Sequence, residues 1–156
     1  RGTPMMVQLM IMYFVVFSSS RHEVAVATLA FGINSGAYVA EIVRGGIMSV
    51  DAGQMEAGRS LGMNYTQTMR HIIIPQAIKN ILPALGNEMI TLLKDTSLMT
   101  VIGAKDLTKA AQTVQAVTYQ AFMPYISIAV VYLVCVIALS KLLALIERRM
   151  RNSDRR

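Results

Sequence analysis

The sequence predicts an all-α membrane protein, a polytopic bundle of transmembrane helices. Only 15% of its 156 residues are charged and 54% are hydrophobic, whereas soluble domains carry about 25% charged residues. The apolar residues gather in blocks of membrane-spanning length. The net charge is +6, but no basic stripe with interleaved aromatic residues accompanies it. We therefore expect the charge to orient the chain in the lipid bilayer, and we expect no nucleic-acid partner.

Four apolar segments are candidate membrane spans. They cover residues 5–17, 24–43, 81–102 and 122–146. The first is interrupted only by Gln8, and the polar residues 18–23 after it lack the small-residue cleavage site of a signal peptide. The second has about the 20 residues that a hydrocarbon core of about 30 Å requires. The third carries charged residues, and the fourth has only Lys141, near its end.

Two longer polar segments, residues 44–80 and 103–120, connect these spans. The first is amphipathic, and we expect Gly45-Gly46, Asp51-Ala52-Gly53 and Gly62-Met63-Asn64 to break it into short helices. We expect the second to be a polar loop. A long amphipathic segment punctuated by glycine and proline suggests a docking surface for a soluble partner.

The distribution of lysine and arginine sets the orientation. Four spans place the N-terminal residue, segment 44–80 and the C-terminal tail on one side of the membrane. That side holds Arg44, Arg59, Arg70, Lys79, Arg148, Arg149, Arg151, Arg155 and Arg156. The opposite segments hold only Arg21, Lys105 and Lys109. Because positive charge is retained on the inside, we expect segment 44–80 and the C-terminus to be cytoplasmic.

Segment 44–80 contains Glu56-Ala57-Gly58, then Gly62, then Ile72 and Pro75. This spacing resembles the cytoplasmic coupling loop of bacterial ATP-binding-cassette importer permeases, the EAA motif. Its pattern is Glu-Ala-Ala, three residues, Gly, nine residues, Ile, any residue, Leu and Pro. Gly58 in place of alanine and Ile74 in place of leucine are mild departures.

The resemblance extends over nearly the whole chain, in order, and narrows to the polar amino acid branch of these permeases, the glutamine, arginine and histidine type. The matching stretches are Ser35–Ile47, Gly53-Gln54, Glu56–Gly58, Pro75–Ala77, Leu82-Pro83 and Lys94–Leu98. It implies an inner-membrane permease subunit of an importer for polar amino acids. Such permeases usually carry one more helix before the Arg-Gly-Thr-Pro stretch that opens this chain, so we expect an N-terminally truncated fragment of a single transmembrane domain, residues 1–156.

The resemblance also implies the partners. Two permease subunits, identical or related, would lie side by side in the lipid bilayer, with cytoplasmic ATP-binding subunits docked on the coupling loop. An extracellular or periplasmic solute-binding protein would deliver substrate to residues 18–23 and 103–120. The sequence has no phosphate-binding Gly-x-x-x-x-Gly-Lys-[Ser/Thr] motif. ATP hydrolysis is therefore expected on a separate subunit, and this chain is not expected to be an enzyme.

Physical roles follow for the coupling residues. A short helix lying across the membrane surface can fit a cleft in an ATPase and move as a lever. Glu56 in a first helical turn would favour the positive end of the helix dipole, Gly62 would end the helix in a left-handed turn, and Pro75 would redirect the chain into the next span. The alternative is an amphipathic helix that rests on lipid headgroups.

Lys94-Asp95-Thr96-Ser97 is the predicted centre of a substrate path. Charges and hydroxyls within a span are costly unless they pair or line a cavity. Asp95 suits the ammonium group or cationic side chain of an amino acid, and Thr96 and Ser97 suit its carboxylate. Alternatively, Lys94 and Asp95 satisfy one another, or Glu88, as a structural network.

Asn87 and Glu88 lie about two turns before Asp95 on the same predicted helix, and they are further path candidates together with Tyr38. Glu41 and Arg44 stand at i and i+3 and are expected to form a structural ion pair. No metal or cofactor site is expected, since the single cysteine, Cys135, excludes a cysteine cluster and the methionines have no ligand spacing.

Two other functional classes remain as alternatives. An ion-coupled secondary amino acid transporter could use Glu88 and Asp95 as proton or cation sites, but it would not need the long cytoplasmic loop. A membrane-bound enzyme lacks any supporting catalytic constellation in this sequence.

Overall fold

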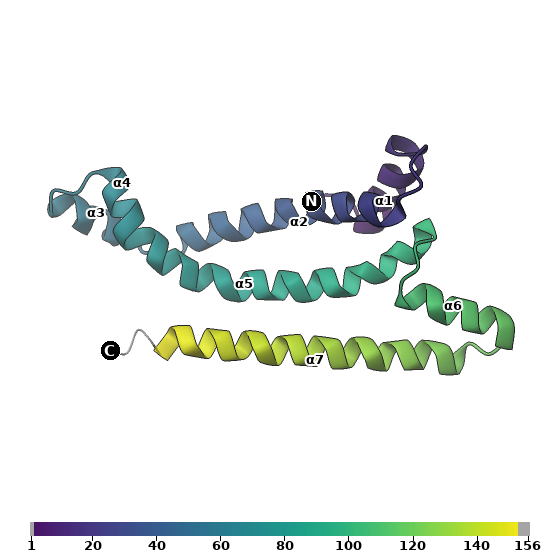
Figure 1. The fold of residues 1–156 in the computed structure, drawn as a ribbon. Coiled ribbons are helices and arrows are strands. Elements are labelled where there is room, and N and C mark those ends of the chain that lie inside the picture. The colour runs from purple at the N-terminus through teal and green to yellow at the C-terminus, as the bar shows by residue number, and fades with distance from the viewer. Residues whose placement is uncertain (1, 153–156) are drawn as a thin grey trace. The chain divides into compact units, whose positions relative to one another are not determined.

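The computed structural model describes residues 2–152, with side chains for residues 2–149, and every regular element in that range is helical. Figure 1 shows the ribbon. The elements are α1 (Met5–Ile11), the π-helix η1 (Met12–Val16), α2 (Glu23–Met48), α3 (Ala52–Ser60), α4 (Tyr65–Thr68), the π-helix η2 (Met69–Ile73), α5 (Ile74–Asp95), the 3₁₀-helix η3 (Thr96–Ile102), α6 (Leu107–Thr118) and α7 (Phe122–Asn152). The predicted all-α class is confirmed.

Two helices are long and apolar enough to cross a membrane. They are α2, with a mean hydropathy of 1.4, and residues Phe122–Arg149 of α7, with a mean hydropathy of 2.6. The helical stretch Met5–Val16 is apolar but shorter. The 22 residues of α5 give it a length of about 33 Å, but it also carries charged residues. The four spans therefore remain a prediction. Two of them meet both the length and the hydropathy criterion.

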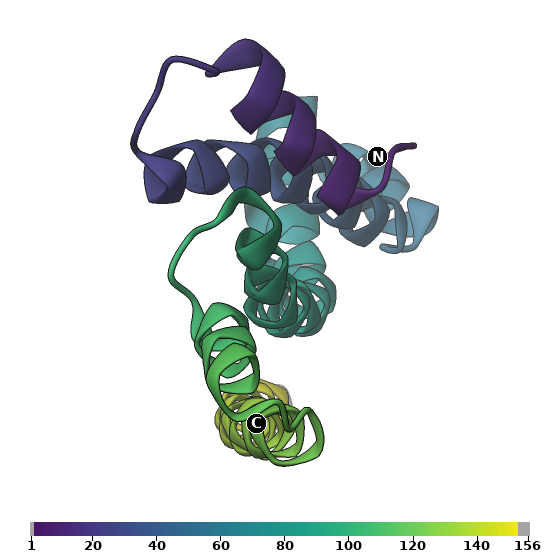
Figure 2. The ribbon, with the colours of Figure 1, turned by 90° about the vertical axis from the view of Figure 1, so that its right-hand side faces the viewer.

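The described residues divide into two compact units. The first comprises residues 2–37 and 89–141. Its core gathers Leu9, Ala27, Ala30, Ile102 and Ala104. Leu9 and Ala27 are completely buried, because the small alanines of α2 let α1 approach closely, as Figure 2 shows. Beside this core the Asn34 amide donates a 2.9 Å hydrogen bond to Gln8 Oε1.

The second unit comprises residues 38–88 and 142–152. Gly45-Gly46 does not break the helix here, contrary to the sequence prediction, because α2 continues to Met48. The reason is packing: a Cβ on Gly46 would lie 2.2 Å from Ile81 Cγ1, so the glycine lets α5 approach α2. Asn80 Nδ2 donates a 2.8 Å bond to Ser49 Oγ beside this contact.

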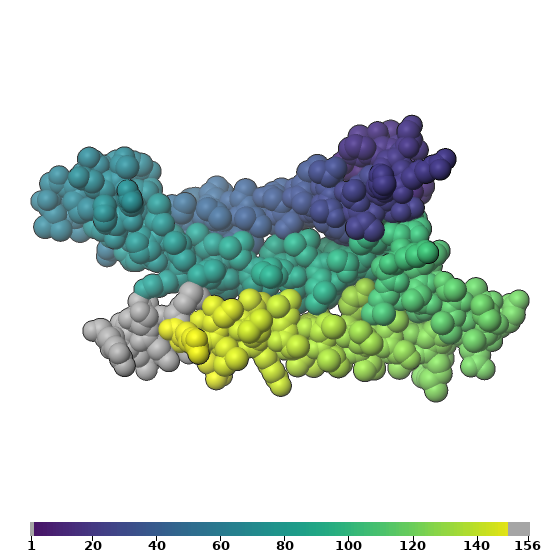
Figure 3. Space-filling model, viewed as in Figure 1, coloured from purple at the N-terminus to yellow at the C-terminus, as the bar shows by residue number. Residues whose placement is uncertain are grey.

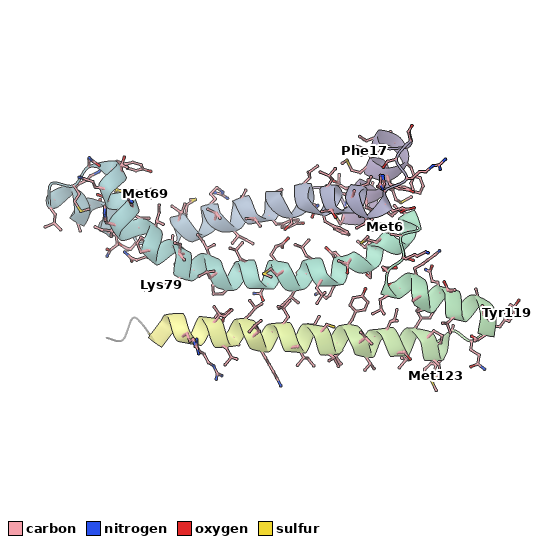
Figure 4. All side chains as sticks on the ribbon, viewed as in Figure 1. Met6, Phe17, Met69, Lys79, Tyr119 and Met123 are labelled. Atoms are coloured by element: carbon pink, nitrogen blue, oxygen red, sulfur yellow. The ribbon has the colours of Figure 1, made fainter. Side chains whose placement is uncertain are left out.

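The predicted polar loop 103–120 is wrong in part, because Leu107–Thr118 forms α6. Asp106 starts this helix by accepting a 2.7 Å hydrogen bond from the backbone N–H of Lys109. Tyr119 ends it in a left-handed conformation, with φ of 56°. The tyrosine is 92% exposed and lies at the end of α6 in Figure 4.

The third predicted span also differs in its bounds. The α-helix starts at Ile74 instead of Ile81, and at Thr96 it narrows to the 3₁₀-helix η3, which ends at Gly103 with φ of 82°. The change of helix type thus falls inside the predicted Lys94–Ser97 site.

Candidate functional site

The predicted coupling residues lie on a helical hairpin formed by α3 and α4. Its first helix begins at Asp51, whose carboxylate accepts a 2.7 Å hydrogen bond from the Gly53 N–H. Glu56 is the fifth residue of α3, so its predicted place in the first turn is wrong. The residue that serves the positive end of the helix is Asp51. Glu56 instead lies exposed in the middle of α3, beside the exposed Ala57.

Gly62 ends α3 as predicted. Its φ is +79°, and two hydrogen bonds close the turn, from Met63 N to Gly58 O at 3.1 Å and from Gly62 N to Arg59 O at 2.9 Å. Together they form a Schellman motif, in which a left-handed residue satisfies the last carbonyls of a helix. The chain reverses within a few residues as a result.

Asn64 then starts α4 with a capping box, which was not predicted from the sequence. Its side chain accepts a 2.9 Å bond from Gln67 N, and Gln67 Oε1 accepts a 2.9 Å bond from Asn64 N. The spacing Asn-x-x-Gln could have revealed it. Both helix ends at the turn are therefore satisfied by residues of the hairpin itself.

Gly58 sets the distance between the two helices. A Cβ at this position would lie 2.5 Å from Thr68 Cγ2 and 2.7 Å from Thr68 Oγ1, and Thr68 is completely buried. The departure from alanine is therefore not mild in this chain, because glycine permits the close packing of α3 on α4. Figure 3 shows the two helices as one closed cluster of blue-green atoms.

Two large side chains project from the turn that the hairpin makes. Leu61 is 79% exposed and Tyr65 is 59% exposed. They lie on either side of Gly62, within the predicted coupling loop. An exposed apolar pair beside satisfied backbone ends offers contact area to a partner protein.

Pro75 does not separate the predicted coupling loop from α5. Helical structure continues from Tyr65 through η2 into α5, and Figure 4 labels Met69 and Lys79 on either side of the proline on one continuous helix. The π-helix accounts for this: Ile74 N bonds to Met69 O, five residues back. The wider π-helical turn directly precedes Pro75. Proline supplies no backbone N–H, and its ring crowds the helical turn before it.

The Lys94–Ser97 segment lies beside a cleft in the first unit, and its place in a substrate path stays a prediction. Lys94 and Ser97 line a cleft of about 320 Å³, together with Thr108, Tyr125 and Tyr132. Asp95 follows Lys94 in the sequence but does not line this cleft, and its side chain is partly buried. Thr96 Oγ1 donates a 2.7 Å bond to Leu93 O, so this hydroxyl proton is used within its own helix.

The sequence suggested two structural ion pairs, Lys94 with Asp95 and Glu41 with Arg44, and only the second is present in the described part of the chain. Among the described residues no ion pair involves Lys94 or Asp95, so mutual satisfaction of these charges is not seen. Glu41 and Arg44, by contrast, form the expected ion pair on α2, with Arg44 Nε 3.1 Å from Glu41 Oε2. Tyr38, Asn87 and Glu88 belong to the second unit, and their place in a shared path stays a prediction.

Comparison with known proteins decides the family. Residues 1–152 match the family described as "Binding-protein-dependent transport system inner membrane component". The chain belongs to this family.

Curated relatives agree with the match. The permease is 42% identical over 155 residues to the "Glutamine transport system permease protein GlnP" of Escherichia coli strain K12, an alignment covering 97% of this chain and 71% of the relative. It is 40% identical over 157 residues to the "Arginine transport system permease protein ArtQ" of Bacillus subtilis strain 168, covering 99% of this chain and 72% of the relative.

A solved structure agrees as well. It is described as "Crystal structure of an amino acid ABC transporter with histidines", with a TM-score of 0.89 and 54% identity over 96% of this chain and 71% of that chain. The protein is thus a membrane permease component of an amino acid importer of the ATP-binding-cassette class, and the family indicates this class, not the ion-coupled alternative. Such components are not themselves enzymes.

Proposed function

We propose that the α3–α4 hairpin is the element through which a cytoplasmic ATP-binding subunit drives this permease. The observation that carries the proposal is the hairpin turn, in which the Gly62 Schellman motif and the Asn64 capping box fix a protruding Leu61 and Tyr65. ATP hydrolysis takes place on that separate subunit. Glu56, Ala57, Gly58 and Pro75 belong to the same element or its continuation into α5.

The arrangement in the membrane follows from charge. The hairpin and the C-terminus face the cytoplasm, because the segments on that side carry the excess of lysine and arginine. Four segments of the chain cross the membrane, and a second permease subunit, identical or related, completes the translocation path. A solute-binding protein delivers substrate from the outer side, near residues 18–23 and the α6 segment.

The transported substrate is a polar amino acid. Relatives named for glutamine and arginine transport, and a related transporter structure described with histidines, support this class. The path runs along Asn87, Glu88 and the Lys94–Ser97 segment, with Tyr38 as a further lining residue.

The docking proposal is tested with the permease and its ATP-binding subunit co-expressed from the full-length genes. Leu61→Asp places a charge in the centre of the proposed contact, and we expect co-purification of the ATP-binding subunit to fall more than tenfold. The control is Val117→Asp, a 75% exposed valine on α6 that matches the 79% exposure of Leu61. Equal co-purification for Leu61→Asp and wild type would contradict the proposal.

The substrate path is tested by ATP-driven uptake of labelled arginine and glutamine into liposomes that hold the complete transporter. If Asp95 pairs with a cationic side chain, Asp95→Asn lowers arginine uptake selectively and leaves basal ATPase activity intact. Equal loss for both substrates would assign Asp95 to the α-ammonium group or to gating. Unchanged uptake would remove Asp95 from the path.

A further inference from the structure

A larger cleft lies within the second unit, between the start of α5 and the end of α7. Its volume is about 630 Å³, within the range of ordinary ligand sites. The connection between α2 and α3 forms its third wall. The predicted substrate path does not include this cleft, and the charged residues that line it are Lys79, Arg148, Asp51 and Glu147.

The lining residues of each helix share one face, because they recur at intervals of three and four residues. The charged ones lie nearer the helix ends. Pro83 and Ala144 lie about one turn farther along α5 and α7, away from these ends, and give that part of the cleft an apolar wall. A ligand that fits the cleft therefore has a charged part and an apolar part. Figure 4 labels Lys79 on α5.

The inner polar groups of the cleft have partners within the chain. Asn80 Nδ2 donates a 2.8 Å hydrogen bond to Ser49 Oγ, and this hydroxyl donates a 2.8 Å bond to Gly46 O. The Asp51 carboxylate accepts the Gly53 N–H at the start of α3. Arg148 and Glu147 differ, because they are exposed and form no ion pair among the described residues.

The sequence of α7 indicates where the cleft lies relative to the lipid bilayer. Residues Phe122–Arg149 have the length and hydropathy of a membrane span. Residues 142–146 are all apolar, and Glu147, Arg148 and Arg149 follow them directly. Charged residues at the end of a span lie at the level of the lipid headgroups. Basic pockets between helices at this level bind lipid phosphates.

We propose that this cleft binds a phospholipid headgroup of the phosphoethanolamine type, which carries both a phosphate and a primary ammonium group. Lys79 and Arg148 donate hydrogen bonds to the phosphate, and the Glu147 carboxylate accepts them from the ammonium group. The glycerol and the first acyl carbons lie against Pro83 and Ala144. The inference goes beyond amino acid transport and rests on the proposed function only in that α7 crosses the membrane.

The test measures lipid retention on the complete transporter, purified in detergent and incubated with equal amounts of phosphatidylethanolamine, phosphatidylcholine and phosphatidylglycerol. Bound lipid is counted by native mass spectrometry. We expect wild type to retain phosphatidylethanolamine in preference to both others, since the choline nitrogen has no N–H to donate and the glycerol headgroup has no cation. Equal retention of all three lipids would overturn the inference.

A matched pair of variants locates the phosphate. Arg148→Gln should lower the retained phosphatidylethanolamine about fivefold. Arg149→Gln removes the same charge from the next residue, which does not line the cleft, and it should retain the wild-type amount. An equal loss in both variants would overturn the inference, because the lipid would then respond only to net charge. Displacement of the lipid by excess inorganic phosphate would assign the site to the free anion and overturn it as well.

Glu147→Gln tests the ammonium contact with a predicted change of sign. Without this carboxylate the basic residues dominate the lining, so the preference should move from phosphatidylethanolamine to phosphatidylglycerol. An unchanged preference would overturn the inference. If Arg148→Gln does not assemble, Glu147→Gln decides.

The outcomes separate this inference from the proposed function. If wild type retains phosphatidylethanolamine selectively but shows no ATP-driven uptake in liposomes, the proposed function fails and the lipid site stands. If uptake is normal and no lipid is retained selectively, only the lipid site fails.

Discussion

The α3–α4 hairpin and the start of α6 differ in whether the polar groups at their helix ends have hydrogen-bond partners. In the hairpin, the helix ends at the turn are satisfied by Gly62, Asn64 and Gln67. At the start of α6, Asp106 Oδ2 and Thr108 Oγ1 are buried without a partner in the described residues. The hairpin is complete by itself, as its proposed role as a lever requires. The start of α6 leaves two buried polar atoms without a hydrogen bond in the described residues.

The largest effect is expected where the hairpin is most tightly packed. Gly58→Ala places a methyl group 2.5 Å from Thr68 Cγ2. The buried threonine cannot move aside, so we expect a loss of about 1–3 kcal/mol, which outweighs the gain of about 0.5–1 kcal/mol for alanine in a helix. A lower thermal midpoint of the purified complex would show it.

A double mutant isolates this contact. Thr68→Ala removes both atoms that overlap the new methyl group, so the pair Gly58→Ala with Thr68→Ala should be more stable than the sum of the single changes predicts. Strict additivity would mean that the helices are not held at this distance.

The end of α3 gives the next largest effect. Gly62 has φ of +79°, and a residue with a Cβ in that region costs about 1–2 kcal/mol. Gly62→Ala should lower the thermal midpoint and the coupling of ATP hydrolysis to uptake. Gly62→Asn should be milder, because asparagine tolerates this conformation. If both variants behave as wild type, the turn does not define the proposed docking surface.

The capping box is expected to contribute less. Asn64→Ala removes the acceptor for Gln67 N, and loss of such a cap costs about 1 kcal/mol. Asn64→Asp keeps the acceptor and serves as the control in the same thermal measurement. A midpoint for Asn64→Ala equal to that of Asn64→Asp would show that α4 is held by packing alone.

These features differ in how far the sequence reveals them. Gly62 was predicted correctly and the Asn64–Gln67 spacing was readable, since helix ends are local chemistry. The Gly46–Ile81 and Gly58–Thr68 contacts were not predictable, because they join residues distant in sequence through their volumes. Sequence rules favoured a break at Gly45-Gly46, yet packing against α5 preserves the helix.

The Lys94–Ser97 segment shows the same limit. Lys94 and Ser97 were singled out as polar residues within an apolar run, and that is a local signal. Their partners Thr108, Tyr125 and Tyr132 come from α6 and α7, and the sequence offered no reason to bring them together. The polar composition of residues 107–118 favours a loop, although Asp106 carries a helix-start signal.

The smallest expected effect gives the most direct comparison of the two regions. Thr68→Val and Thr108→Val are the same chemical change at two buried hydroxyls. Thr68 Oγ1 donates a 3.0 Å bond to Asn64 O, so its loss should cost about 1 kcal/mol. Thr108 Oγ1 has no such partner, so its loss should change stability by less than about 0.5 kcal/mol. Equal shifts in thermal midpoint without added amino acid would mean that Thr108 is satisfied within the permease assembly. A shift for Thr68→Val alone would mean that only the Thr68 hydroxyl makes a hydrogen bond that stabilises the fold.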